Sequence, residues 1–229
     1  RNLCSRGCPF GGYFSSVNAT IPAAAATGNL TIKTFQVVNE VIYDEKLGRA
    51  TGVRAVDAQT GRGIEYFARI IFVNASTIAT TAILLNSKSR RFPDGLGNDS
   101  GQLGRNLMDH HSNAGAYALF EGKFSDTYYR GRRPCGFIIP RFRNIKEAER
   151  GRHGFLRGYN FQGHGERQEW EDRSKWLEGF GVNYKEALTR PGPWAVWMAG
   201  WGECLPYPEN RVTLDPEQTD KWGMPLVRI

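Results

Sequence analysis

The sequence predicts an α+β fold in which a three-stranded antiparallel meander leads into a buried central strand. Three runs rich in β-branched and aromatic residues follow one another at 29–43, 50–58 and 65–73, and short Gly-containing turns separate them. The last run ends in Ile70-Ile71-Phe72-Val73, a continuous apolar stretch typical of a strand buried on both faces.

Two helices are predicted around this meander. Ala19 to Ala26 is a run of mostly small residues, and the Thr27-Gly28 pair that follows suits a left-handed helix end. Farther along, Asn74-Ala75-Ser76-Thr77 leads into Thr80 to Leu85, whose apolar residues have helical spacing. We expect Ser76 or Thr77 to cap this second helix.

The connection between the apolar run and the second helix is a candidate binding site. A buried strand, a turn of small side chains and a helix N-terminus bring unpaired backbone N–H groups together, which suits anions such as a dinucleotide pyrophosphate. The small side chains of Ala75 and Ser76 would let a cofactor approach the backbone closely. The alternative interpretation is an ordinary strand-to-helix connection.

A domain boundary is predicted near residue 112, with one domain at 1–112 and a second at 113–229. Beyond this boundary the chain is more aromatic and holds all six Trp residues. Strands are predicted there at 113–121, 136–141, 193–200 and 211–214. His153 and His164 lie among Gly and Arg residues, where exposed loops are expected.

Length and charge exclude several classes of protein. The 229 residues can bury a sizeable core, and no apolar stretch reaches the roughly 20 residues that span a bilayer. The net charge is +7, and residues 121–176 hold 13 Lys and Arg against 8 Asp and Glu. Runs of these charges alternate in sign and no recognition motif accompanies them, so nucleic acid is not an expected partner. The sequence is compatible with either a cytoplasmic or a periplasmic location.

Metal ligation is not expected from the His and Cys residues. His110 and His111 are adjacent, so in a strand they would point to opposite faces. Asp109 precedes them, but the spacing supplies no third and fourth ligand. Cys4 and Cys8 are separated by three residues and could join an iron–sulfur centre only with further cysteines upstream.

Three short segments carry recognisable signatures. Asn2 to Gly12 contains a CxxxCPxG pattern. Ala75 to Ser87 follows the pattern GSxx(S/T)PxxLLxxSG, with departures at Ala75, Ala79 and the adjoining Lys88. Gly104 to His110 reads GRNLMDH, similar to vGxNLxDH. Together these segments resemble the middle of a glucose-methanol-choline (GMC) FAD-dependent oxidoreductase, nearest to the gluconate and fructose dehydrogenase flavoprotein branch.

The resemblance implies a partial FAD-binding domain over 1–112, followed by part of an antiparallel substrate-binding domain over 113–229. It implies FAD as the cofactor, a small alcohol or sugar as the substrate, and hydride transfer from a CH–OH group to the flavin. The chain contains neither the family's GxGxxG fingerprint nor its catalytic His, which is expected downstream of Ile229. The fragment alone is therefore expected to be inactive, and the rest of its own polypeptide is an expected partner.

The resemblance also implies cofactor-binding residues, among which a valine lies near the FAD adenine. These residues are Val38 (the valine), Asn74, Ala75, Ser76, Asn106, Asp109 and His110. Trp194 and Trp197 are the candidate substrate residues. With Trp201 they recur at three- and four-residue spacing, which suits core packing equally well.

Three functions are compatible with these features. The first is part of an FAD-dependent oxidoreductase, and the family resemblance favours it. The second is a carbohydrate- or partner-binding module that uses the Trp-rich residues 113–229. The third is a basic nucleic-acid binder, which only the net positive charge supports.

Overall fold

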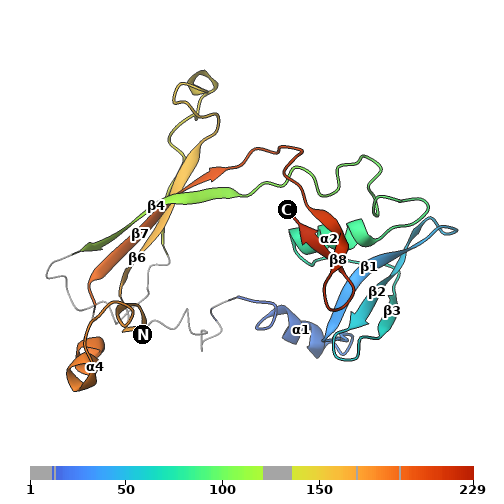
Figure 1. Ribbon diagram of the computed structural model, residues 1–229, viewed down its shortest axis with the longest axis horizontal. Helices are drawn as coiled ribbons and strands as arrows, with labels where there is room; N and C mark the ends of the chain where they lie inside the picture. Colours follow the sequence, from blue (N-terminus) through green and yellow to red (C-terminus); the bar gives the residue numbers. More distant parts are fainter. Residues whose placement is uncertain (1–11, 13, 121–135, 169, 191) are drawn as a thin grey trace. The chain divides into compact units, whose positions relative to one another are not determined.

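The computed structural model describes residues 12, 14–120, 136–168, 170–190 and 192–229. These residues form two compact units. The meander unit comprises residues 29–108 and 205–229, and the four-stranded unit comprises the described residues of 1–28 and 109–204. Each unit contains a sheet of its own (Figure 1).

The meander unit is built on the predicted three-stranded antiparallel sheet, which the structure confirms. Its strands lie in the order β1–β2–β3, with the bounds Gln36–Asp44, Arg49–Asp57 and Gly63–Phe67. In the first turn, Asp44 Oδ1 accepts a hydrogen bond from the N–H of Lys46 at 2.8 Å. In the second turn, Asp57 Oδ1 accepts one from the N–H of Gln59 at 2.9 Å. Each turn therefore satisfies a backbone donor with an Asp side chain.

The predicted start of the first strand is wrong. The prediction begins at residue 29, whereas β1 begins at Gln36. Phe35 has a φ of +58°, in the left-handed region that an extended strand does not adopt. The chain therefore changes direction at Phe35, and the β-branched residues before it do not pair with β2.

The predicted buried central strand is also wrong. β3 ends at Phe67, and residues 68–73 form no strand. Ile70 is 72% exposed and Phe72 is 81% exposed. A strand buried on both faces needs neighbouring strands, and none pairs with this segment within the described part of the unit. The apolar run is therefore left uncovered.

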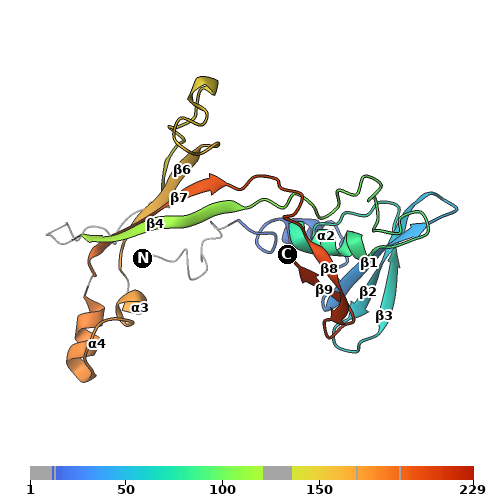
Figure 2. The same cartoon turned by 45° about the horizontal axis from the view of Figure 1, so that its top comes forward.

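The second predicted helix is confirmed as α2 (Thr77–Asn86), which buries Ala82 and Ile83. This helix contacts β1 and β8, the first strand of a small two-stranded sheet in the same unit (Figures 1 and 2). β8 overlaps the strand predicted at 211–214. The bounds of β8 and β9 are Thr213–Thr219 and Pro225–Arg228.

Residues 205–229 pack within the meander unit, whereas the predicted boundary at residue 112 assigns them to the second domain. Two backbone hydrogen bonds give the physical reason. The N–H of Val212 donates to the Gly104 carbonyl at 2.7 Å, and the N–H of Leu107 donates to the Asn210 carbonyl at 2.7 Å. These bonds join the end of the chain to the loop that follows α2, a long-range pairing that local sequence does not reveal.

The four-stranded unit contains an antiparallel sheet in the order β4–β7–β6–β5. The bounds of β4 to β7 are His110–Phe120, Phe137–Ile139, Tyr159–Arg167 and Trp194–Glu203. β4, β5 and β7 confirm the strands predicted near 113–121, 136–141 and 193–200. β6 was not predicted, and it places His164 on a strand where an exposed loop was expected.

The helices of this unit are short. α1 confirms the helix predicted near residue 19, and Gly28 follows it with a φ of +72°. α1, the 3₁₀ turn η3, α3 and α4 have the bounds Thr20–Ala26, Glu147–Glu149, Trp170–Arg173 and Gly181–Thr189. Few helices and mostly antiparallel sheets are consistent with the predicted α+β class.

No helix in the part of the chain that the structure describes is long and apolar enough to cross a membrane.

Candidate functional site

The meander sheet has one apolar face. Val41 pairs with Val53 across β1 and β2, and both side chains point to this face. Val38 points to it as well, although only two residues separate it from Val41. The register of β1 shifts at Asn39, and this irregularity puts both valines on one side.

The opposite face of the sheet carries a row of charges. Arg54 donates a hydrogen bond to Glu65 at 2.9 Å and a second one to Glu40. The hydrogen bond to Glu65, followed by the charge of Glu40, raises the pKa of Arg54 above its ordinary value. The side chain of Arg54 is 45% exposed, so these ion pairs contribute little to stability. They keep this face polar and leave the valine face as the side that can bind an apolar group.

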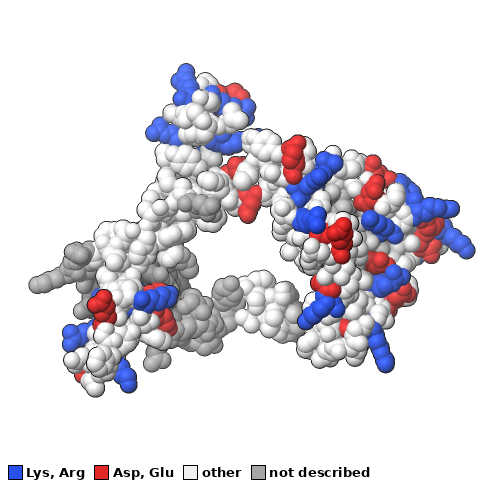
Figure 3. All heavy atoms as spheres, viewed as in Figure 1, with Lys and Arg blue, Asp and Glu red and all other residues white. Residues whose placement is uncertain are grey.

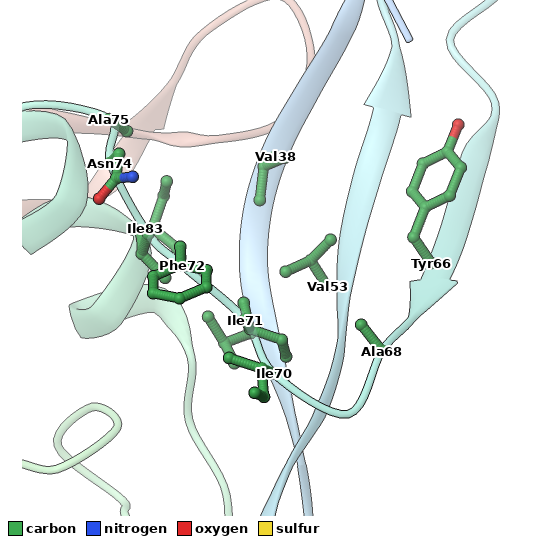
Figure 4. Close-up of a pocket in the computed structure, with 12 residues that line it drawn as sticks. Val38, Val53, Tyr66, Ala68, Ile70, Ile71, Phe72, Asn74, Ala75 and Ile83 are labelled. Carbon is green, nitrogen blue, oxygen red and sulfur yellow. The ribbon is translucent and has the colours of Figure 1, made fainter. Parts of the chain in front are cut away.

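An apolar cavity of about 420 Å³ lies on the valine face. Figure 4 shows Val38 and Val53 on neighbouring strands and Ile83 on α2, with the segment Ile70–Phe72 between them. Polar side chains enter the lining only at Tyr66 and Asn74. A cavity of this size with few polar groups suits a flat, largely apolar group.

The turn from Val73 into α2 is open and poor in side chains. Asn74, Ala75 and Ser76 are all exposed, and Ser76 has a φ of +71°. The predicted cap does not form, because Ser76 makes no side-chain hydrogen bond to the helix. Instead Thr80 Oγ1 accepts a hydrogen bond from the N–H of Ala75 at 3.1 Å. The first N–H groups of α2 have no partner inside the helix and are available to a ligand.

Three of the predicted cofactor-binding residues line the cavity, namely Val38, Asn74 and Ala75. Ser76 follows them directly along the chain. Asn106 belongs to the same unit but does not line the cavity. Its amide donates a hydrogen bond to Gln102 Oε1 at 3.0 Å, and its φ of +59° marks a tight turn. A role for Asn106 with the cofactor stays a prediction.

Asp109 and His110 lie at the start of the other unit. Asp109 Oδ1 accepts a hydrogen bond from the N–H of His110 at 2.7 Å, and its carbonyl accepts one from Cys204 at 3.0 Å. The His110 ring meets Trp201 edge-on, with ring centroids 5.8 Å apart. These contacts are structural, and the cofactor roles of both residues stay predictions.

Trp197 lies in a row of ring-bearing side chains on the four-stranded sheet. Tyr117 of β4 and His164 of β6 are its direct cross-strand partners, so the three side chains share one face. The His164 and Trp197 ring centroids are 5.6 Å apart. Tyr117 is 55% exposed and accepts a hydrogen bond from the amide of Gln168 at 2.7 Å. The row combines aromatic surface with polar groups, as a sugar or polyol would require.

Trp194 points to the face opposite Trp197, because only two residues separate them on a strand whose register is regular there. The two predicted substrate residues therefore do not form one platform. Trp194 pairs with Phe120 and Arg167 on its neighbouring strands. Trp201 shares the face of Trp197, and its indole Nε1 is buried without a hydrogen-bond partner among the described residues.

Sequence reasoning missed Tyr117 and His164 as neighbours of Trp197. The alternation in Tyr159-Asn160-Phe161-Gln162 was the available strand signal, but Gly163 and Gly165 interrupt it around His164. Gly163 is required by packing, since a Cβ there would lie 2.2 Å from the Trp197 carbonyl oxygen. Close pairing with β7 therefore requires a glycine at this position. That glycine interrupts the alternation of side chains by which the strand could have been predicted.

Among the residues that the structure describes, no group of three or more His, Cys, Asp or Glu side chains could hold a metal ion. Cys4 and Cys8, the iron–sulfur candidates, lie outside the described residues.

Comparison with known proteins bears on these sites. Residues 2–112, which contain the whole cavity, match the model of the GMC oxidoreductase family. Residues 2–112 belong to the GMC oxidoreductase family. The family resemblance inferred from the signature segments is thereby confirmed. The relatives support an oxidoreductase function.

The chain is similar in sequence to three curated proteins. The chain is 28% identical to 2-methyl-1,2-propanediol dehydrogenase of Mycolicibacterium austroafricanum over 97% of its length and 40% of that protein. It is 25% identical to the fructose dehydrogenase large subunit of Gluconobacter japonicus over 98% of its length and 39% of that protein. A shorter region, 46% of the chain, is 34% identical to 6'''-hydroxyparomomycin C oxidase of Streptomyces lividus and covers 19% of it.

The chain therefore spans at most about 40% of the length of these relatives.

Proposed function

We propose that this chain is part of an FAD-dependent oxidoreductase that oxidises a CH–OH group of a sugar, a sugar acid or another small alcohol. Membership of the GMC family supports the reaction class, because the family is generally FAD-dependent. The names of the relatives, which include a diol dehydrogenase and a fructose dehydrogenase subunit, support the substrate class.

The apolar cavity beside the open turn at Asn74–Ser76 is the observation that carries the proposal. A buried or plugged turn would not admit a nucleotide, whereas all three residues of this turn are exposed. The walls formed by Val38 and Val53 suit an adenine ring. The free N–H groups at the start of α2 suit the negative charge of a phosphate.

The residues of this chain would bind and orient the reactants. A bound flavin supplies the hydride acceptor, which no amino-acid side chain can replace. Val38, Val41 and Val53 would exclude water from the adenine ring. Trp197 and its neighbours Tyr117 and His164 would pack against the apolar face of a sugar ring, since both surfaces then leave water.

The proposal assigns a role to each unit. The meander unit would belong to the FAD-binding domain, together with parts of the polypeptide outside this chain. The β4–β7–β6–β5 sheet would belong to the substrate-binding domain.

A cofactor assay on the intact polypeptide tests the proposal. The purified protein is expected to show the absorbance bands of a flavin and to release FAD on denaturation. Val38→Trp would fill the cavity and should weaken FAD retention by about tenfold or more. Val37→Trp is the matched control, because Val37 alternates with Val38 and points to the other face of β1.

Two outcomes would contradict the proposal. One is a colourless intact protein that takes up no added FAD. The other is equal FAD retention by the Val38 and Val37 variants. A colourless protein whose tryptophan fluorescence still responds to sugars would instead favour the carbohydrate-binding module that the Trp197 row supports.

A further inference from the structure

The loop at residues 140–158, called here the tip loop, joins β5 to β6 and extends past the end of their sheet (Figures 1 and 2). Asn144 fixes its shape from inside. This residue is only 6% exposed, and its amide nitrogen donates hydrogen bonds to the carbonyls of Phe155 at 3.0 Å and Arg157 at 3.2 Å. The two arms of the loop are thereby joined.

Aromatic rings anchor the base of the tip loop to the sheet. Phe142 meets Tyr159 edge-on at 5.7 Å and stacks with Phe161 at 6.2 Å between ring centroids. Phe155 lies 5.6 Å from Tyr159 on the other arm. The loop is therefore a built element whose surface side chains have defined positions.

The surface of the tip loop is strongly basic. Residues 140–158 contain six Lys and Arg but only two acidic residues. Both acids serve internal contacts, because Glu147 pairs with Arg150 at 2.7 Å and Glu149 Oε2 accepts the N–H of Ile145 at 3.1 Å. Figure 3 shows the Lys and Arg side chains gathered on this projection.

Several of these cations have no carboxylate partner among the described residues, namely Arg141, Lys146 and Arg157. They line a shallow cavity of about 80 Å³ together with Ile145 and Leu156. Ile145 is 59% exposed and Leu156 is 61% exposed. Large aliphatic side chains and unpaired cations thus share one surface at the end of a projection.

We propose that the tip loop docks the protein onto the surface of a bilayer that contains anionic phospholipids. Arg141, Lys146 and Arg157 pair with lipid phosphate groups, and Ile145 and Leu156 enter the boundary between headgroups and acyl chains. Basic and apolar residues on one exposed surface are the combination that holds proteins at a membrane interface. The inference is independent of the proposed oxidoreductase activity.

Sedimentation with lipid vesicles tests this docking surface on the intact polypeptide. Vesicles of phosphatidylcholine with phosphatidylserine are expected to bind the protein, and binding should weaken as salt is added. The double variant Lys146→Glu and Arg157→Glu should bind at least tenfold more weakly, because each cation near an anionic surface contributes about fivefold. The double variant Ile145→Ser and Leu156→Ser should also bind more weakly.

Matched controls lie in the turns of the meander sheet. Lys46→Glu with Arg62→Glu reverses two exposed cations, and Leu47→Ser removes an aliphatic side chain that is 60% exposed. These variants should bind vesicles as the unmodified protein does. Equal thermal unfolding of all variants confirms that they are folded, and single Ala substitutions replace any that are not.

Three results would overturn the proposal. The first is no binding to the anionic vesicles. The second is binding that the Lys146 and Arg157 reversals leave unchanged. The third is binding that depends on these cations but not on Ile145 and Leu156, which would show that the two aliphatic side chains do not enter the bilayer.

Discussion

The hydroxyl of Ser87 accepts a hydrogen bond from the backbone N–H of Val41 at 2.8 Å. The same hydroxyl donates to the Ile83 carbonyl at 2.6 Å. Asn86 adds a bond from its amide to the Asn39 carbonyl at 2.9 Å. Because β1 is an edge strand, its outward backbone groups would otherwise lack partners. The end of α2 therefore completes the edge of the meander sheet beside the candidate cofactor cavity.

Ser87→Ala is expected to lower the free energy of unfolding by about 1–3 kcal/mol, because it leaves the buried Val41 N–H without an acceptor. Urea unfolding of the intact protein measures the change. Ser100→Ala removes an exposed hydroxyl and should leave the midpoint unchanged. If the two variants unfold at the same urea concentration, the Ser87 bridge does not stabilise the sheet edge.

Asp215 makes stability depend on pH. The N–H groups of Glu217 and Gln218 donate to its carboxylate and lower its pKa, and a hydrogen bond from Arg228 at 2.6 Å lowers it further. The ionised form therefore stabilises the fold above the unfolded pKa of about 3.9. This contribution is lost as the pH falls through the lower pKa of the folded state.

Asp215→Asn is thus expected to be less stable than the unmodified protein near pH 7, and the difference should close as the pH falls below about 4. Thermal unfolding at a series of pH values measures it. Asp94→Asn, which removes an exposed carboxylate, is the control. A difference that stays constant down to low pH would show that the loss arises from packing and not from ionisation.

The local parts of the meander were predictable from the sequence. β-branched runs and Asp- and Gly-containing turns act over a few residues, so the end of β1, all of β2 and the start of β3 lie close to their predicted positions. The apolar run at 68–73 was not predictable in this way. Its composition is typical of a buried strand. Burial, however, depends on neighbouring strands and helices that come from distant parts of the chain. Within the described residues it has none, and it stays exposed.

The candidate site was predictable only as a set of residues, without its geometry. The family signature pointed to Asn74 and Ala75, and both line the cavity with Val38. The sequence could not reveal the register shift at Asn39 that turns Val41 toward the same cavity. A β-bulge depends on how two strands pair, and residue propensities do not encode that pairing.

Gly104→Ala is expected to destabilise the protein by more than about 1–2 kcal/mol. Gly104 has a φ of +84°, and a Cβ there would lie 2.4 Å from the carbonyl oxygen of Val212. The first effect alone costs about 1–2 kcal/mol, and the second would push the Val212 segment away from its hydrogen bond. Gly61→Ala separates the two, because Gly61 has a φ of +71° but open space around it. Equal thermal midpoints for both variants would show that the close approach at Gly104 contributes nothing.

The two faces of β7 differ in a way that tests the proposed substrate site. Trp197 and Trp194 are both half-buried tryptophans of one strand, so replacement by Ala should cost similar packing energy. Only Trp197 shares its face with Tyr117 and His164. In the intact protein, if it is the proposed oxidoreductase, Trp197→Ala should therefore raise KM for a sugar or diol substrate about tenfold, whereas Trp194→Ala should leave KM close to that of the unmodified protein. Steady-state kinetics over a panel of fructose, glycerol and short diols measures both constants. A rise in KM for Trp194→Ala alone would move the substrate site to the other face of the sheet.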